Sequence, residues 1–144
     1  MPRTVKPEAV ADRLNSATIH LLRRAARTDV EAGIGPAQLS ALSVLVFGGS
    51  TTLSGLAEAE QVTPATMSRI VKALAESGLV SKEPSGRDRR SLRISATPAG
   101  RRLMQAARQR RISALTDRLA MLSEQDLAAL ERAAELMEQV AVVP

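Results

Sequence analysis

The chain has 144 residues, of which 44% are hydrophobic but only 1% aromatic, so its core must be built from aliphatic side chains. It contains no cysteine, which excludes disulfides, thiol catalysis, thiol-based redox sensing and cysteine zinc sites. The net charge of +5 is uneven: residues 63–111 carry 12 Lys/Arg against 3 Asp/Glu, residues 1–62 carry 6 against 6, and residues 112–144 carry 2 against 6.

The first part of the chain is predicted to be helical. An apolar stripe predicts a helix over residues 7–32, which glycines end. A proline opens a second helix over residues 36–47, whose nearly continuous apolar sequence indicates a buried, central position. After a Gly-Gly-Ser break we expect a short helix over residues 53–60, capped by Thr52 or Ser54.

The next segment carries the clearest functional pattern. Thr63 can cap a helix that begins at Pro64, because its hydroxyl accepts a backbone N–H and proline has no N–H to leave unpaired. Apolar residues then recur with helical spacing at Met67, Ile70, Val71 and Leu74. The opposite face is polar and basic and consists of Ala65, Thr66, Ser68, Arg69, Lys72 and Glu76. With the short helix before it, this helix predicts a helix-turn-helix.

After Gly78 the apolar spacing changes from helical to alternating, which predicts a two-stranded ribbon. The segment between the strands, residues 83–90, contains Pro and Gly for a tight reversal. Its tip gathers three arginines and one acid: Arg87, Arg89, Arg90 and Asp88. If this tip meets a polyanion, an unpaired carboxylate there would be repelled. We therefore interpret Asp88 as an anchor that fixes one guanidinium.

Two helices are expected to complete the chain. Thr97 and Pro98 repeat the cap-and-proline start and predict a long helix to about residue 121, and Ser123 opens a last, acidic helix. The terminal helices carry more apolar surface than one small module can cover, so we expect a second copy of the chain to cover them. The alternative is that they fold back on the first helix within one monomer.

The charge pattern favours a nucleic-acid partner, although a basic patch can also be a merely solvated surface. A single His, no glycine-rich phosphate loop and no clustered carboxylates predict that the chain is not an enzyme and uses no cofactor or metal. A helical adaptor whose basic face binds an acidic partner remains the competing hypothesis. Without an apolar signal region or spanning segment, we expect a cytoplasmic protein with no membrane partner.

The order of these elements, with TPATMSRIVKALAESGLV, the GRDRRS loop and TPAGRRL, resembles the MarR family of winged helix-turn-helix regulators over nearly the whole chain. The resemblance implies one mainly α domain, residues 1–144, with a small β-hairpin wing. Residues 36–97 would form the winged helix-turn-helix DNA-binding region, and residues 1–35 and 98–144 the flanking dimerisation helices. It further implies a homodimeric repressor of a pseudo-palindromic double-stranded DNA operator, relieved by a small-molecule effector.

The resemblance also implies roles for residues. Thr66, Ser68 and Arg69 would face bases or phosphates in the major groove, while Arg90 would enter the minor groove, oriented by Asp88. The full set of predicted DNA-binding residues is Thr63, Ala65, Thr66, Ser68, Arg69, Lys72, Arg87, Asp88, Arg89 and Arg90. Because the family often binds small aromatic acids, candidate effector contacts are His20, Arg24 and Phe47. The alternative is that His20 is an ordinary surface histidine with no role in effector binding.

Overall fold

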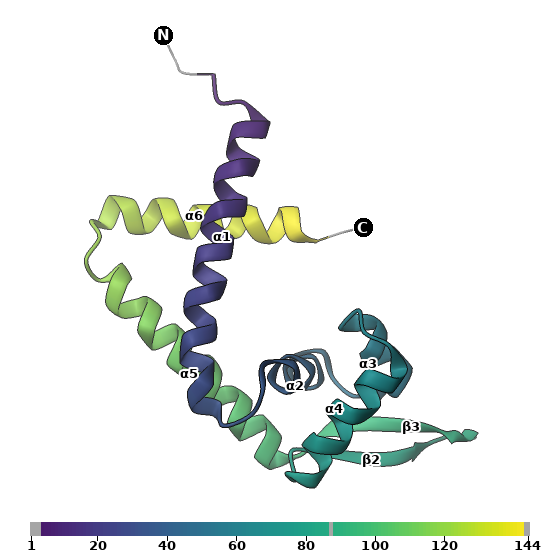
Figure 1. The fold of residues 1–144 in the computed structure, drawn as a ribbon. Coiled ribbons are helices and arrows are strands. Elements are labelled where there is room, and N and C mark those ends of the chain that lie inside the picture. Colours follow the sequence, from purple (N-terminus) through teal and green to yellow (C-terminus); the bar gives the residue numbers. More distant parts are fainter. Residues whose placement is uncertain (1–3, 87, 143–144) are drawn as a thin grey trace. The chain divides into compact units, whose positions relative to one another are not determined.

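A computed structural model describes residues 4–86 and 88–142, apart from the side chains of residues 88–90. Most of the chain is helical, and residues 51–96 contribute the strands of a small antiparallel sheet (Figure 1). The elements in chain order are α1 (Pro7–Asp29), η1 (Val30–Ala32), α2 (Pro36–Gly48), β1 (Thr51–Thr52), α3 (Leu53–Ala59), α4 (Pro64–Glu76), β2 (Val80–Ser85), β3 (Asp88–Ala96), α5 (Pro98–Leu119) and α6 (Glu124–Ala141). The predicted fold class, mainly α with a β wing, is therefore confirmed.

Local sequence accounts for where the helices begin. Proline is the first residue of α1, α2, α4 and α5, where its missing N–H costs no hydrogen bond. The short helix α3 is capped by Thr52, whose Oγ1 accepts from the Gly55 N–H at 3.1 Å, so the choice between Thr52 and Ser54 falls on Thr52. Ser123 Oγ likewise accepts from the Asp126 N–H at 3.1 Å and caps α6.

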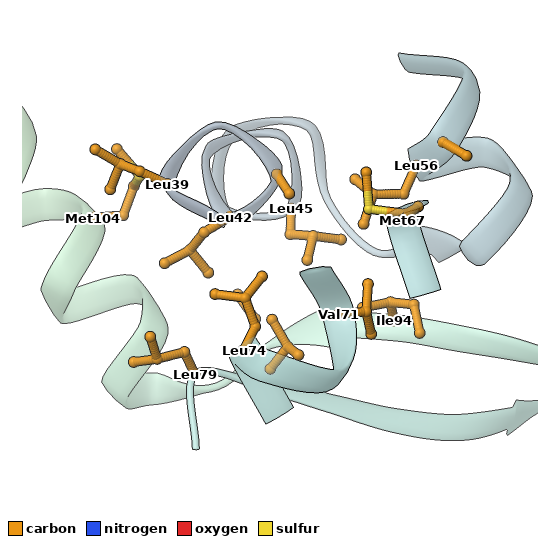
Figure 2. Close-up of a cluster of buried hydrophobic side chains, with 14 of the residues drawn as sticks. Leu39, Leu42, Leu45, Leu56, Met67, Val71, Leu74, Leu79, Ile94 and Met104 are labelled. Atoms are coloured by element: carbon orange, nitrogen blue, oxygen red, sulfur yellow. The ribbon is translucent and has the colours of Figure 1, made fainter. Parts of the chain in front are cut away.

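The chain divides into two compact units: the first ends at Gln109 and the second begins at Arg110. The core lies in the first unit. Figure 2 shows how α2, α3, α4, β3 and the first turns of α5 each direct aliphatic side chains into it. Its largest fully buried side chains are Leu42, Leu45, Leu56, Met67, Val71, Leu74, Ile94 and Met104. This confirms the predicted core face of α4 and the central place of α2, which buries four of its residues.

The sheet has three strands rather than the predicted two, in the order β1-β3-β2. The added strand is β1, in which Thr51 pairs with Ile94 and Thr52 with Arg93. A strand of two residues is too short to show any alternation in the sequence, and its pairing depends on residues far along the chain. A hydrogen bond of 2.7 Å between the hydroxyls of Ser50 and Ser95 holds the same edge.

The hairpin turn is shorter than predicted. Most of the segment 83–90, expected as a loop, belongs to the strands, because β2 continues to Ser85 and Asp88 pairs with it. The ladder is irregular between Pro84 and Ser85. Pro84 is tolerated because β2 is an edge strand, so the missing N–H interrupts no central ladder. Gly86 takes a positive φ of 51° at the reversal, while Arg87 lies outside the described residues.

The terminal helices differ from the others in burial. Neither α1 nor α6 contains a single buried residue, although both carry apolar stripes. Along α1, Val10, Leu14 and Leu21 are 38–53% exposed. Within the described part of the chain no single helix is long and apolar enough to cross a bilayer, and only the pair 7–32 and 36–48, bent by 93°, passes on length and composition together.

Gln61, in the turn between α3 and α4, is strained: it has a φ of +54° and is the one non-glycine residue with positive φ among those described. Gln61→Gly is therefore expected to raise the free energy of unfolding by about 0.5–1 kcal/mol, because glycine adopts this conformation without the steric cost of a Cβ. Denaturant unfolding would measure it. The control Ser77→Gly, at a φ of −83°, should lower stability instead, and equal changes in both variants would contradict the assignment of strain.

Candidate nucleic-acid interface

Helix α4 divides into a buried face and an exposed face. Met67, Val71 and Leu74 anchor it against α2 and α3, so the helix cannot rotate without opening the core. The opposite face carries the residues that the sequence predicted for DNA contact, and all six are exposed: Thr63, Ala65, Thr66, Ser68, Arg69 and Lys72. Short side chains near the N-terminus of the helix would allow its backbone to approach a groove closely.

The hydroxyls of Thr63 and Thr66, at the start of α4, make different hydrogen bonds. Thr63 Oγ1 accepts from the Thr66 N–H at 3.2 Å and donates to Thr66 Oγ1 at 3.0 Å. Because a hydroxyl carries one proton, that of Thr63 is used within the helix, while the Thr66 hydroxyl keeps its own proton to donate outward. Thr63 thus serves mainly as the cap that orients Thr66, and Thr66 is the better candidate to donate to an acceptor atom on a base edge.

The cations of α4 are available to a polyanion. Lys72 Nζ lies 4.0 Å from Glu76 Oε1, but the two side chains are 73% and 68% exposed. A solvated pair at this distance contributes little stability, so Lys72 can turn to a phosphate at small cost. Arg69 lies three residues before Lys72 on the same helix and is also exposed. No ion pair involving Arg69 occurs among the described residues.

The wing is formed by β2 and β3, paired antiparallel from Val80 with Ala96 to Ser85 with Asp88. Its base is fixed to the core, because Val80, Ile94 and Ala96 are buried. The register places the backbone of Asp88, Arg89 and Arg90 in the first residues of β3, at the far end of the wing from the core. The side-chain roles predicted for these three residues, and for Arg87, fall outside what the structure describes.

Two exposed cations on the wing, Lys82 and Arg93, were not among the predicted site residues. Arg93 lies opposite Glu83 across the ladder, and Lys82 lies opposite Ile94. Both belong to the basic segment, but each is an isolated cation within its strand. The sequence around them therefore gave no signal that would separate them from ordinary surface charges. The predicted ribbon already includes both residues, but their partners across the ladder are known only from the register.

Among the described residues, no hydrogen bond or ion pair joins the three candidate effector residues to one another. His20 and Arg24 lie one turn apart on α1, and Phe47 lies in the last turn of α2. All three are exposed, Phe47 to 56%. Within the described chain, no group of three or more His, Asp or Glu residues could hold a metal ion.

Known proteins share both the sequence pattern and the fold. The model of the MarR family matches residues 32–91, which span α2 to the start of β3. An uncharacterised HTH-type transcriptional regulator of Mycobacterium bovis is 34% identical over 128 residues, covering 89% of this chain and 90% of the relative.

Solved structures extend the likeness to the whole fold. A MarR family protein from Bacillus stearothermophilus has a TM-score of 0.78 at 23% identity, covering 94% of this chain and 97% of that protein. NadR in complex with 4-hydroxyphenylacetate has a TM-score of 0.67 at 19% identity and covers both chains completely. The chain belongs to the MarR family of transcriptional regulators and has its winged helix-turn-helix fold.

Proposed function

We propose that the protein is a homodimeric, cytoplasmic repressor that binds a pseudo-palindromic operator in double-stranded DNA. The observation that carries this proposal is the division of α4: one face is locked into the core, and the other presents small polar and cationic side chains to solvent. A major groove about 12 Å wide accepts such a helix, and Thr, Ser and Arg can bond to base edges there.

In this proposal α4 reads the major groove and the wing reaches the adjacent minor groove. Thr66, Ser68 and Arg69 contact bases or nearby phosphates, and Lys72 contacts a phosphate. At the end of the wing, Arg90 enters the minor groove with Asp88 holding its guanidinium, while Arg87 and Arg89 add phosphate contacts. The supporting facts are the exposure of α4 and the backbone position of residues 88–90 in β3.

Dimerisation is proposed from the apolar stripes of α1 and α6, which bury no residue within one chain. The second copy of the chain is the occupant that would cover Leu14 and Leu21 of α1 and Leu130 and Met137 of α6, all 38–53% exposed. Two-fold symmetry would also place two copies of α4 about one turn of B-DNA apart, roughly 34 Å.

Sedimentation at micromolar concentration is expected to give twice the chain mass of 15.3 kDa. Leu14→Glu should shift the protein toward monomer, because a carboxylate buried in an apolar interface without a partner is costly. Asn15→Glu, on the adjacent exposed position, is the matched control and should remain a dimer. A monomeric wild type that still bound DNA specifically would contradict this part of the proposal.

We propose further that a small aromatic acid relieves repression. NadR, a fold neighbour, binds 4-hydroxyphenylacetate, and in this chain His20, Arg24 and Phe47 are the proposed contacts. An effector would act by binding one spacing of the two recognition helices better than another. Titration of aromatic acids into a DNA complex should release the duplex, and no release at any concentration would reject this class of effector.

Selection of bound fragments from the source genome, followed by competition with random duplex, tests the function as a whole. We expect the selected sites to bind at least about a thousandfold more tightly than random DNA at physiological salt, as specific DNA-binding proteins do. A protein that binds all duplexes equally, but captures an acidic protein partner, would be an adaptor instead.

A further inference from the structure

One hydroxyl connects the end of α4 to the beginning of α5. Thr97 Oγ1 donates to the carbonyl oxygen of Gly78 at 2.7 Å and accepts from the Gly100 N–H at 3.1 Å. The second bond caps α5, as expected for a threonine at this position. The first is not needed for capping, because it joins the two ends of the wing: Gly78, with a φ of +71°, precedes β2, and Thr97 follows β3.

The backbone tightens the same junction. The N–H of Thr97 donates to the Leu79 carbonyl oxygen at 3.0 Å. A Cβ built on Gly100 would lie 2.1 Å from this oxygen, so the first turn of α5 packs directly on the Leu79 carbonyl. Leu79 in turn donates its N–H to Leu74 in the last turn of α4 at 2.9 Å, and β2 begins at the next residue. We name Gly78, Leu79, Thr97 and Gly100 the junction.

The junction therefore joins three elements at one place: the recognition helix α4, the base of the wing and α5. All of its residues lie in the same compact unit as the core. On the strength of the function proposed above, we infer that Thr97 is a positioning residue for DNA recognition: its hydroxyl fixes the angle at which α4 and the wing are presented together, without itself touching DNA.

This role affects specific and non-specific binding differently. Hydrogen bonds to base edges require donor–acceptor distances within a few tenths of an ångström, so a small rotation of α4 would lose them. Attraction between cations and phosphates acts over about 8 Å at physiological salt and tolerates such a rotation. Loss of the Thr97 hydroxyl should therefore lower the preference for operator over random DNA rather than lower all binding.

The test compares two variants of the wild type. Thr97→Val removes the hydroxyl with little change of shape, and Thr97→Ser retains the hydroxyl. For Thr97→Val we expect the ratio of operator to random-duplex affinity to fall about tenfold while random-duplex affinity and its salt dependence stay unchanged. Thr97→Ser should keep the wild-type ratio. The matched control is Ser123→Ala, because Ser123 caps α6 by the same kind of bond, and both hydrogen bonds of its hydroxyl are to Asp126 in the first turn of that helix.

A wild-type ratio in Thr97→Val, or an equal loss in Ser123→Ala, would overturn the inference and leave Thr97 as an ordinary cap. A wild type that does not discriminate between duplexes would instead reject the proposed function. A second measurement needs only the wild type: operator should slow hydrogen exchange of the Gly100 N–H about tenfold more than random duplex does. Equal protection by both duplexes would also overturn the inference.

Discussion

Gly100→Ala is expected to lower the free energy of unfolding by about 3 kcal/mol. The added Cβ would meet the Leu79 carbonyl oxygen at 2.1 Å and Leu42 Cδ1 at 3.2 Å. The first neighbour is backbone that is already bonded to the Thr97 N–H, and the second belongs to a fully buried side chain, so neither can move without disturbing its own contacts. The first turn of α5 must then shift away from α4, and the junction opens.

Gly48→Ala is the matched control, because Gly48 is also a helical glycine but an added Cβ would meet only Val44 Cγ1, at 4.0 Å. Alanine there gains helix propensity and is expected to raise stability by up to about 1 kcal/mol. Denaturant unfolding of both variants measures the contrast. A Gly100→Ala protein as stable as wild type would show that the junction adjusts easily and would weaken the case for tight coupling of α4 to α5.

Arg90→Ala is expected to cost operator binding about 1–3 kcal/mol and to flatten the preference at the flanking bases. The reason is that narrow minor grooves have an enhanced negative potential, which favours an inserted guanidinium at some sequences over others. The proposal places Arg90 at the far end of the wing, where β3 begins. Asp88→Ala should reproduce part of the loss, because the guanidinium would no longer be held in one orientation.

Lys72→Ala provides the contrast within the same protein. Its side chain is exposed and only weakly paired with Glu76, so we expect it to meet a phosphate. The variant should weaken operator and random duplex by similar factors and reduce the salt slope by about one counterion. Affinity measured against salt on both duplexes separates the two roles. Equal losses on both duplexes for Arg90→Ala would mean that the wing supplies only generic positive charge.

The sequence predicted most of the fold because its signals were local. Thr63 with Pro64 marks the start of α4, the spacing of Met67, Val71 and Leu74 marks its buried face, and Gly78 marks its end. These features depend on residues within a few positions of one another. The exposure of the predicted α4 contacts followed from the same periodicity.

What could not be predicted depends on contacts between distant segments. β1 exists because Thr51 and Thr52 pair with β3, and the wing is longer because Ser85 pairs with Asp88. Thr97 and Gly100 were recognised as a helix start, but their bonds to Gly78 and Leu79 required the folded chain. Gln61 gave no signal at all, since glutamine is not a residue that favours positive φ.

Footprinting of the wild-type protein on a selected genomic fragment tests the central claim most directly. A symmetric dimer that places two copies of α4 in successive major grooves should protect two half-sites related by a dyad, with centres about 34 Å apart, and the wings should extend protection into the flanking minor grooves. Protection of a single half-site, or of no discrete site at any protein concentration, would contradict the account.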